Sequence, residues 1–415
     1  MNMLKRTFYA VSAILLVCVL LAPFLNVYGQ NQTAQREFFV AKGMYNDQLY
    51  GLAANQLKEF VQKYPDSQYA GEAQFLLAES YLQTQDYSRA IPAYRELLTK
   101  YQAVGYRDKA QFRMGEAMVN AGDFQNALKA FDTFLDQYPN SELKPNALYW
   151  YGEAYYRAGE TDQALKYYRN VYENYPNAPL ADYAAYSAAF IFEEKSQWDE
   201  ATDAYNQLIS RNPDSPLVDQ AMYRIGFASY GKGDYGEAIS DFQAAIEKYP
   251  DSPLRGEAQY FIGESYYNQN EFRQSIEEYT KAVTVENSQY QDDSQYSMAW
   301  AYAELEEYQA AAEAFEQVPQ YSQESSLISS SVFQAGRNWL LAGNNSEARE
   351  AFNTVFTEYP NASDAPNALY EYASLEFENG SYVSAREHYS SIVEDHPNSE
   401  LVPDAALMIG ECYFT

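Results

Sequence analysis

Cysteine, histidine and positive charge are scarce in this sequence of 415 residues. It holds two Cys and two His, and 28 Lys and Arg stand against 58 Asp and Glu, which gives a net charge of −30. Two Cys provide no disulfide framework, so side-chain packing must hold the fold. The acidic surface repels nucleic acid and anionic lipid and favours basic or neutral partners, although a generic solvated surface explains this charge equally well.

Long apolar runs are also absent, except near the N-terminus. Lys5 and Arg6 precede the apolar stretch 10–25, and Val27 and Gly29 place short side chains at the −3 and −1 positions of a cleavage site. This order is typical of a secretory signal peptide. We therefore expect residues 1–29 to be removed and the mature chain to be exported.

Two other fates of this segment stay open. The run is short for a membrane span, so retention as an anchor is the weaker alternative. Lipid attachment at Cys18 is disfavoured because Val17 stands where lipidation signals carry Gly, Ala or Ser. Removing residues 1–29 takes away two of the 28 basic residues and no acidic one, so 26 against 58 leaves a net charge of −32. Cys412 is then the remaining thiol.

Four features recur every 37 residues along the chain. They are an Ala, a small residue five positions later, a second Ala twelve positions further on, and an aromatic ring four positions beyond that Ala. The series run through Ala73, Ala110, Ala147, Ala184, Ala221 and Ala258; through Ala78, Gly115, Gly152, Ala189, Gly226 and Gly263; through Ala90, Ala127, Ala164, Ala201, Ala238 and Ser275; and through Tyr94, Phe131, Tyr168, Tyr205, Phe242 and Tyr279. Such a period indicates an array of stacked structural units.

The array is predicted to fill almost the whole mature chain. After a short tail at 30–33, ten units of about 37 residues cover 34–397, with one residue lost before Phe315. An eleventh unit begins at residue 398 and stops at residue 415 after its first helix. Because a terminal repeat normally carries a polar covering helix, we expect this sequence to be a fragment of a longer protein.

Within each unit the apolar residues are spaced as in two helices. In the unit at 221–250, one apolar stripe ends at Gly231-Lys-Gly-Asp234, and a second runs from Tyr235 to Ile246. Gly and Asp end the first helix and Pro250 ends the second, which predicts two antiparallel helices joined by a tight turn. The small residues are expected to let the helices approach closely, and the rings to fill the space between successive pairs.

At this point the unit at 221–250 resembles a tetratricopeptide repeat, because its small residue, Ala, aromatic residue and Pro follow in the order of that family. The resemblance implies an all-α, right-handed superhelical solenoid of antiparallel helix pairs whose first helices line a concave, protein-binding groove. The longer 37-residue form ending in Tyr-Pro-x-Ser is similar to repeats of bacterial envelope proteins, including the Tol–Pal-associated periplasmic coordinator and the outer-membrane-assembly lipoprotein. It implies a location in the periplasm of a Gram-negative-type bacterium.

Aromatic and acidic residues recur on the predicted first helices. An aromatic ladder lies three residues before each small position, and Glu often follows that position by one residue. The candidate partner-binding residues are Phe112, Tyr149, Tyr186, Tyr223 and Tyr260 of the ladder, then Glu116, Glu153 and Glu264, and finally Tyr156, Tyr230 and Tyr267 four residues after the small position. Such a trough suits peptides with basic and apolar side chains. The ladder is equally well explained by packing between adjacent first helices.

Catalytic and cofactor motifs are lacking. His396 replaces the Tyr of a Tyr-Pro pair, and His388 has no Cys, Asp or Glu at a recurring ligand spacing, so no metal site is predicted. The string Gly231-Lys-Gly-Asp-Tyr-Gly236 satisfies a dinucleotide-binding pattern but joins two helices, and is interpreted as a turn. We predict no catalytic residue, no cofactor and no enzymatic activity.

The leading hypothesis is a periplasmic scaffold that holds envelope or cell-wall proteins along its groove. A second hypothesis is the targeting arm of a larger enzyme or transport assembly. A third is a factor for outer-membrane protein assembly, which predicts co-purification with barrel proteins. Partner identity and oligomeric state do not follow from this sequence.

Overall fold

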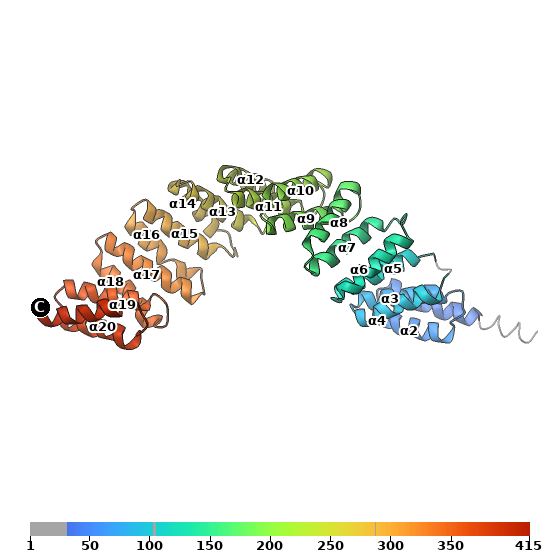
Figure 1. Ribbon diagram of the computed structural model, residues 1–415, viewed down its shortest axis with the longest axis horizontal. Coiled ribbons are helices and arrows are strands. Elements are labelled where there is room, and N and C mark those ends of the chain that lie inside the picture. The colour runs from blue at the N-terminus through green and yellow to red at the C-terminus, as the bar shows by residue number, and fades with distance from the viewer. Residues whose placement is uncertain (1–30, 103–104, 287) are drawn as a thin grey trace, which may run out of the picture. The chain divides into compact units, whose positions relative to one another are not determined.

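Every regular element of the described residues, 31–102, 105–286 and 288–415, is helical in this computed structural model (Figure 1). The all-α prediction is therefore confirmed. The expected signal peptide at residues 1–29 lies outside the described residues. Within them, no helix combines the length and the apolar character that a membrane crossing needs.

The chain divides into two compact units, Met1–Ile191 and Phe192–Thr415. In the first unit, first and second helices alternate along the sequence. The first helices are residues 31–46, α3 (Ala70–Gln83), α5 (Arg107–Asn120) and α7 (Lys144–Arg157), and the second helices are α2 (Tyr50–Lys63), α4 (Tyr87–Lys100), α6 (Phe124–Gln137) and α8 (Thr161–Asn174). Helix α9 (Ala181–Glu194) spans the division between the units.

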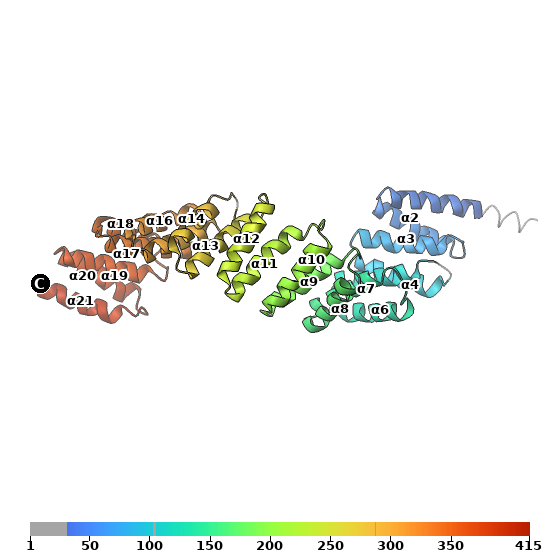
Figure 2. The same ribbon diagram turned by 90° about the horizontal axis from the view of Figure 1, so that it is seen from above.

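The second unit repeats the same alternation, and Figure 2 shows α19, α20 and α21 packed side by side in this unit. Its first helices are α11 (Val218–Lys232), α13 (Arg255–Asn268), α15 (Gln291–Glu304), α17 (Ser325–Leu341), α19 (Ala365–Glu378) and α21 (Val402–Phe414). Its second helices are α10 (Trp198–Arg211), α12 (Tyr235–Lys248), α14 (Phe272–Val283), α16 (Tyr308–Phe315), α18 (Asn345–Glu358) and α20 (Tyr382–Asp395), with a 3-10 turn at Val318–Gln320.

The turn inside each helix pair has one fixed geometry. Its second residue has a positive φ, and these residues are spaced 37 apart with one interval of 36: Gln48, Gln85, Gly122, Gly159, Ser196, Gly233, Asn270, Glu306, Gly343 and Gly380. Two backbone hydrogen bonds close the turn at Gly233. The Gly233 N–H donates to the Tyr230 carbonyl at 2.9 Å, and the Asp234 N–H donates to the Ser229 carbonyl at 3.0 Å. The glycine-rich string around Gly233 is thus a turn between two helices, as predicted.

The left-handed turn position predicts a simple stabilising change. Glu306 carries a φ of 59°, which costs a residue with a Cβ about 1–2 kcal/mol relative to its preferred backbone. Glu306→Gly is therefore expected to raise the free energy of unfolding by about 1 kcal/mol, and Gly233→Ser to lower it by a similar amount. Urea denaturation followed by circular dichroism measures both changes. Destabilisation by Glu306→Gly would contradict this account of the turn.

Within each helix pair, the ring of the second helix lies directly on the small residue of the first helix. A Cβ built on Gly226 would come within 2.6 Å of the ring of Phe242, sixteen residues further along the chain. The same contact recurs between Gly115 and Phe131, Gly152 and Tyr168, Gly263 and Tyr279, and Gly336 and Phe352. The small residues of the first helix therefore let a ring of the second helix lie directly against the backbone of the first helix.

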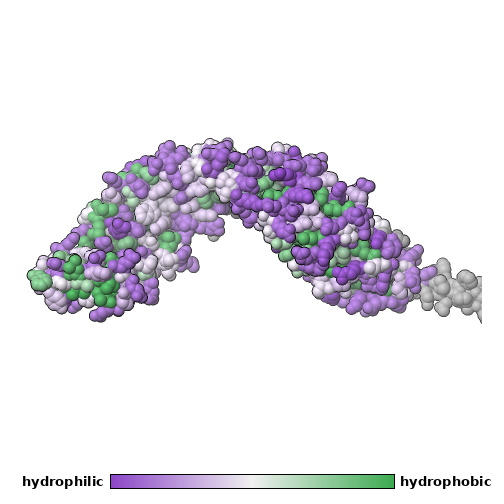
Figure 3. Space-filling view, viewed as in Figure 1, coloured by the Kyte–Doolittle hydropathy of each residue, from purple (hydrophilic) through white to green (hydrophobic). Residues whose placement is uncertain are grey.

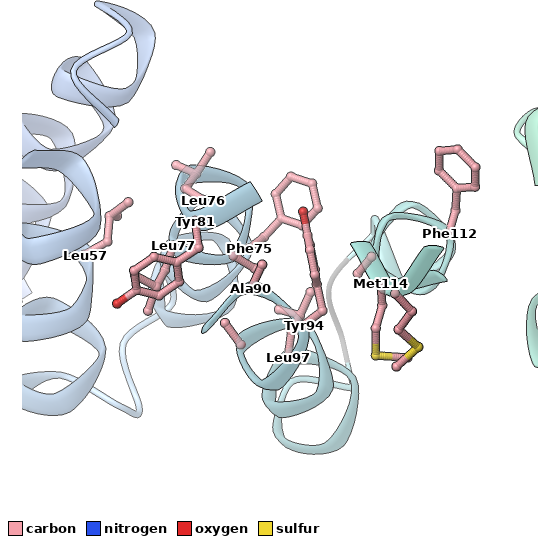
Figure 4. Close-up of a cluster of buried hydrophobic side chains, with 14 of the residues drawn as sticks. Leu57, Phe75, Leu76, Leu77, Tyr81, Ala90, Tyr94, Leu97, Phe112 and Met114 are labelled. Atoms are coloured by element: carbon pink, nitrogen blue, oxygen red, sulfur yellow. The ribbon is translucent and has the colours of Figure 1, made fainter. Parts of the chain in front are cut away.

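Figure 4 shows buried side chains of the first unit, where the Tyr94 ring of α4 lies close to Phe75 of α3. Tyr94, Ala90 and Leu97 have no exposed surface, and they form one continuous cluster with Phe75 and Phe112. The rings that recur on the second helices therefore form the hydrophobic core of each unit.

The turn before α13 begins that helix without a side-chain cap. The residue preceding α13 is Leu254, and its side chain makes no capping bond. Instead, the Ser252 hydroxyl accepts the N–H of Leu254 at 3.3 Å, and the Ser252 N–H donates to the Tyr249 carbonyl at 3.1 Å. The Ser of the Tyr-Pro-x-Ser segment therefore fixes the turn and leaves the helix uncapped.

Candidate functional site

First helices lie against one another within each unit, so their outer surfaces form a continuous face. Helix α5 contacts α7 in the first unit, and α13 contacts both α11 and α15 in the second. We call the exposed side of these helices the first-helix face. It contains the candidate residues that the sequence predicted.

The aromatic ladder is divided between the core and this face. Phe112 and Tyr223 are 4% and 0% exposed, so both rings lie mainly in the core. Tyr149, Tyr186 and Tyr260 are half-buried and keep part of each ring at the surface. The same ladder position therefore serves packing in some repeats and reaches the surface in others.

The half-buried ladder tyrosines also pack on neighbouring rings. Tyr260 stacks on Tyr290 with centroids 5.1 Å apart, and Tyr149 lies 5.7 Å from Tyr168. Burial raises the pKa values of Tyr149 and Tyr260, and the nearby Glu153 and Glu264 carboxylates raise them further. These phenols are therefore neutral hydrogen-bonding groups at physiological pH.

The predicted Glu series has a structural role that the sequence reasoning did not assign. Glu153 and Glu264 accept the hydroxyls of Tyr168 and Tyr279, each at 2.6 Å. Glu79, which is 2% exposed, accepts the hydroxyl of Tyr94 in the same way. These carboxylates lie under the first-helix face and anchor the core rings, rather than simply edging a groove.

Whether the second helix carries Tyr or Phe correlates with the residue that directly follows the small residue of the first helix. Where the second-helix ring is Tyr, an acceptor usually stands there, and where it is Phe, an acceptor is usually missing. The Tyr pairs are Tyr94 with Glu79, Tyr168 with Glu153, Tyr279 with Glu264, and Tyr389 with Ser374; the Phe pairs are Phe242 with Phe227, Phe315 with Trp300, and Phe352 with Arg337.

Two repeats depart from this correlation for visible reasons. Glu116 stands in the unit of Phe131, but it is engaged by Arg113, whose Nη1 donates to its Oε2 at 2.6 Å. Phe190 stands in the unit of Tyr205, and the carboxylate that interacts with Tyr205 is instead Glu193. Burial raises the pKa of Glu193, and the Arg224 guanidinium and the Tyr205 hydroxyl oppose the shift.

Removing one ring hydroxyl tests the pairing. Tyr279→Phe leaves the half-buried Glu264 carboxylate without its donor, so a loss of about 1–3 kcal/mol in the free energy of unfolding is expected. Adding Glu264→Phe reproduces the Phe227–Phe242 pair of the neighbouring repeat and should restore part of the loss. Urea denaturation of the two single variants and the double variant measures the coupling. Additive losses would show that the hydrogen bond is not the cause.

An open cavity of about 300 Å³ lies on the first-helix face of the first unit. Its walls come from α5, α7 and the segment leading to α9, and they combine apolar side chains with polar and charged ones: Phe112, Leu143, Trp150 and Leu180, with Lys109, Arg113, Glu116 and Asn146. The Arg113 guanidinium pairs with Glu116 and lies 3.7 Å from Glu79.

A row of aromatic rings covers the first-helix face of the second unit. Phe261 of α13 is its centre, with centroids 4.9 Å from Phe227, 5.0 Å from Tyr230 and 5.9 Å from Tyr290. All four side chains are half-buried. The sequence analysis identified Tyr230 as a candidate but did not identify Phe227, Phe261 or Tyr290. One signal for Phe261 is that an aromatic residue directly follows the ladder residue in three repeats, at Phe39, Trp150 and Phe261.

The remaining predicted tyrosines also lie on this face. Tyr267 is half-buried and packs on Phe272 at 5.2 Å, and Tyr156 is half-buried on α7. The Asn268 amide lies 3.5 Å from the Tyr230 hydroxyl. Each therefore combines a packed ring with a polar tip near the surface, as is common at protein interfaces.

Carboxylates surround the aromatic row. Glu257 accepts the hydroxyl of Tyr290 at 3.1 Å, and burial raises the pKa of Tyr290 to about 12, an effect that the Glu257 charge increases. Burial also raises the pKa of Asp293, and Asp292, Glu264 and Glu324 add to the shift. This crowding of like charges gives the row a negative potential, which a cationic side chain would relieve.

The side chain of His388 contacts a buried carboxylate of α19. His388 Nδ1 is 2.7 Å from Oε2 of Glu376, twelve residues earlier in the chain. Glu376 is buried and also accepts the Ser384 hydroxyl at 2.7 Å. No group of three or more ligating side chains suited to a metal occurs among the residues that the structure describes. Glu376 is thus a buried carboxylate held by several partners.

Comparison with known proteins supports the repeat architecture. The tetratricopeptide repeat family model matches residues 45–104, 112–179, 188–253, 260–325 and 334–400. None of the curated proteins matches the chain significantly.

Solved structures that are similar to the chain share little sequence identity with it. The C-terminal part of a TPR repeat-containing protein from Cytophaga hutchinsonii is 17% identical with a TM-score of 0.50, over 62% of this chain and 99% of that chain. A tetratricopeptide repeat protein from Parabacteroides merdae is 15% identical with a TM-score of 0.41, over 64% of this chain and 98% of that chain.

Proposed function

The chain belongs to the tetratricopeptide repeat family, whose model matches more than half of it, and we propose that it is a non-enzymatic scaffold that binds other proteins along its first-helix face. The observation that carries this proposal is the aromatic row formed by α11, α13 and the residue that precedes α15. Phe227, Tyr230, Phe261 and Tyr290 keep part of their surface exposed although apolar burial is available throughout the array. Rings of this kind supply much of the binding energy of protein interfaces.

The charge around the row indicates the chemistry of the partner. Glu257, Glu264 and Asp293 lie among the rings, and the whole chain carries a net charge of −30. A segment with Lys or Arg beside apolar side chains would match the potential and the rings together. We therefore propose that the partner presents a basic and apolar segment.

The segment at residues 1–29 supports a location outside the cytoplasm. Its order of basic, apolar and short residues is that of a secretory signal, and the proposed mature N-terminus is Gln30. Together with the long Tyr-Pro-x-Ser repeats, it favours a role in assembling or coordinating proteins of a bacterial envelope. N-terminal sequencing of the mature protein tests this location, because an intact Met1 would contradict it.

Neutralising two carboxylates beside the aromatic row is expected to weaken binding of a basic peptide by about tenfold. The peptide is selected on the wild-type protein from a random library, and the variant is Glu257→Gln with Asp293→Asn. Each lost charge removes roughly 0.5–1 kcal/mol of attraction at a partly exposed site. Fluorescence anisotropy at physiological salt measures the affinity.

The second helix α12 provides a control with the same net charge. Glu237 and Glu247 are exposed there, so Glu237→Gln with Glu247→Gln removes two charges away from the row. This pair should leave the affinity within about twofold, since distant exposed charges are screened. Equal losses in the two double variants would attribute the binding to overall charge and reject the proposed face.

A further inference from the structure

An open cavity of about 520 Å³ lies between α18 and α19 in the second unit, and we call it the α18 cavity. Its lining is mainly polar and includes Asn345, Arg349, Glu350, Asn353, Tyr372 and Asn379. Hydrophilic and intermediate residues cover most of the face seen in Figure 3, so a polar lining alone does not mark a binding site. The α18 cavity is distinguished by two places where its lining departs from the pattern of the other repeats.

The first departure is the loss of a ring at the start of the second helix. Helix α18 begins with Asn345, whereas most other second helices begin with an aromatic residue: Tyr50, Tyr87, Phe124, Trp198, Tyr235, Phe272, Tyr308 and Tyr382. Trp198 shows what such a ring does, because a Cβ on Gly231, near the end of the next first helix, would come within 2.8 Å of it. In α18 the smaller Asn345 stands at this position, and the space beside the end of α19 stays open.

The second departure lies one helical turn later. Arg349 of α18 stands where five other second helices have an aliphatic residue: Ile91, Leu128, Leu165, Ile239 and Ile276. Helix α8 begins with Thr161 but keeps Leu165, and α20 has Arg386 but begins with Tyr382. Helix α18 combines both changes, and they replace apolar packing with a polar cavity.

Polar groups of the lining are left available to a ligand. Within the described residues, the side-chain amides of Asn345, Asn353 and Asn379 make no hydrogen bond to the rest of the chain. Arg349 Nη2 lies 3.7 Å from Oε1 of the buried Glu376, which is beyond hydrogen-bonding distance. The same guanidinium lies over the Tyr372 ring, 5.2 Å from its centroid. The cavity therefore offers several donors and acceptors beside one aromatic ring.

This set of groups favours a neutral ligand that is rich in hydroxyls. A carboxamide both donates and accepts hydrogen bonds, as does a hydroxyl, so the three amides match a row of hydroxyls. The Arg349 charge is balanced within the lining by Glu350, and the net charge of −30 disfavours anions. Tyr372 provides an apolar surface for the C–H groups of a sugar ring. The lining has few of the apolar side chains that anchor a peptide.

We propose that the α18 cavity is a binding site for a neutral oligosaccharide. The amides of Asn345, Asn353 and Asn379 bind its hydroxyls, and the Tyr372 ring packs against the C–H face of one sugar. The volume of the cavity falls within the range of about 300–1,000 Å³ that is usual for small-ligand pockets. The site goes beyond the proposed protein-binding function, because it lies on a second helix and takes a different class of ligand.

Isothermal titration calorimetry of the whole chain with trisaccharides tests the site. The neutral probes are maltotriose, cellotriose and triacetylchitotriose, and trigalacturonic acid is the anionic probe. At least one neutral trisaccharide should bind with a Kd below about 1 mM, and trigalacturonic acid should give no binding heat at about 10 mM.

Two variants with matched controls locate the binding. Asn345→Tyr restores the ring of the other second helices and should abolish binding, while the melting temperature stays the same or rises because a cavity is filled. Thr161→Tyr makes the same change at the start of α8 and should leave the affinity within about twofold. Asn353→Ala removes one amide and should weaken binding about fivefold, whereas Gln243→Ala, at the equivalent position of α12, should leave it unchanged.

Binding that survives Asn345→Tyr, or no binding of any neutral probe at about 10 mM, would overturn the proposal. Preferential binding of trigalacturonic acid would also overturn it, because the cavity would then be an anion site built on Arg349. Asn345→Tyr should leave the affinity for the basic peptide of the first-helix face unchanged. The two sites are thus measured with separate ligands, and failure of one proposal leaves the other standing.

Discussion

Alkaline solution is expected to unfold this protein cooperatively above pH 10. Burial raises the pKa of the phenols of Tyr94, Tyr168 and Tyr279 above the ordinary value of 10.0, and their Glu partners raise it further. The pKa of each of these phenols is higher in the folded state than in the unfolded state. The phenols therefore stabilise the fold below pH 10, and this stabilisation is lost as the pH rises towards the pKa of the folded state.

The size of this effect follows from the unfolded state. At pH 11, one unit above their unfolded pKa, tyrosines that stay neutral in the fold each lower the free energy of unfolding by about 1.4 kcal/mol. The three core phenols, none of which is exposed, then account for roughly 4 kcal/mol, a large part of the usual stability of a domain. Other half-buried tyrosines, such as Tyr149 and Tyr260, act in the same direction.

Two optical signals measure the alkaline transition together. The part of the tyrosinate absorbance near 295 nm that comes from the core phenols should rise at the same pH at which helical circular dichroism is lost, because these phenols ionise only on unfolding. Tyr279→Phe removes one such phenol, whereas Tyr183→Phe changes a ring that is 40% exposed and should leave the slope of stability against pH unchanged. Ionisation of all tyrosines near pH 10 in a helical protein would contradict this account.

Truncating a core ring is the second large change. Phe242→Ala is expected to lower the free energy of unfolding by about 3–5 kcal/mol, because Phe242 has no exposed surface and its ring fills the space against Gly226. Gly226→Leu should cost about 1–3 kcal/mol, since even a Cβ there would come within 2.6 Å of the ring. Urea denaturation measures both losses.

Combining the two changes tests the contact itself. In the double variant the Leu side chain can occupy space vacated by the ring, so the total loss should be smaller than the sum of the single losses by at least about 1 kcal/mol. Gly236→Leu is the matched control, because a Cβ at Gly236 meets no atom within 4 Å. Additive losses for Gly226 and Phe242 would show that the two residues are not packed against each other.

The helix pairs could be predicted from the sequence because the turn residues, the aromatic positions and the Pro positions recur with one common period. The 37-residue period placed the turn at Gly233, the second-helix ring at Phe242 and the end of α12 before Pro250, and the structure has all three. The recurrence of these residues in one chain replaced the comparison of related sequences that such predictions usually need.

The 37-residue period does not predict which ladder residues are buried and which reach the surface. Tyr223 and Tyr260 hold the same position, but Tyr223 is fully buried and its hydroxyl reaches the Tyr249 carbonyl at 3.3 Å, whereas Tyr260 is half-buried and stacks on Tyr290. Burial here depends on the residues of the following turn, which vary between repeats. The position of a residue within the repeat therefore does not predict whether its side chain is buried.

The Tyr–Glu pairs were within reach of the sequence but went unrecognised. Glu264 and Tyr279 are fifteen residues apart on different helices, so their contact follows only from the packing of the pair. Comparing repeats within the chain would have shown that Glu tends to accompany Tyr and that Phe227 accompanies Phe242. The Glu residues were instead assigned to the surface because carboxylates are usually exposed.

Site-specific photo-cross-linking in living cells tests most directly whether the first-helix face binds proteins. A photoreactive amino acid replaces Tyr230 on α11 in one variant and Gln243, an exposed residue of α12, in the other. The account predicts that position 230 yields a defined adduct whose partner peptide contains Lys or Arg next to apolar residues, while position 243 yields only background. Equal adducts from both positions, or adducts from position 243 alone, would contradict it.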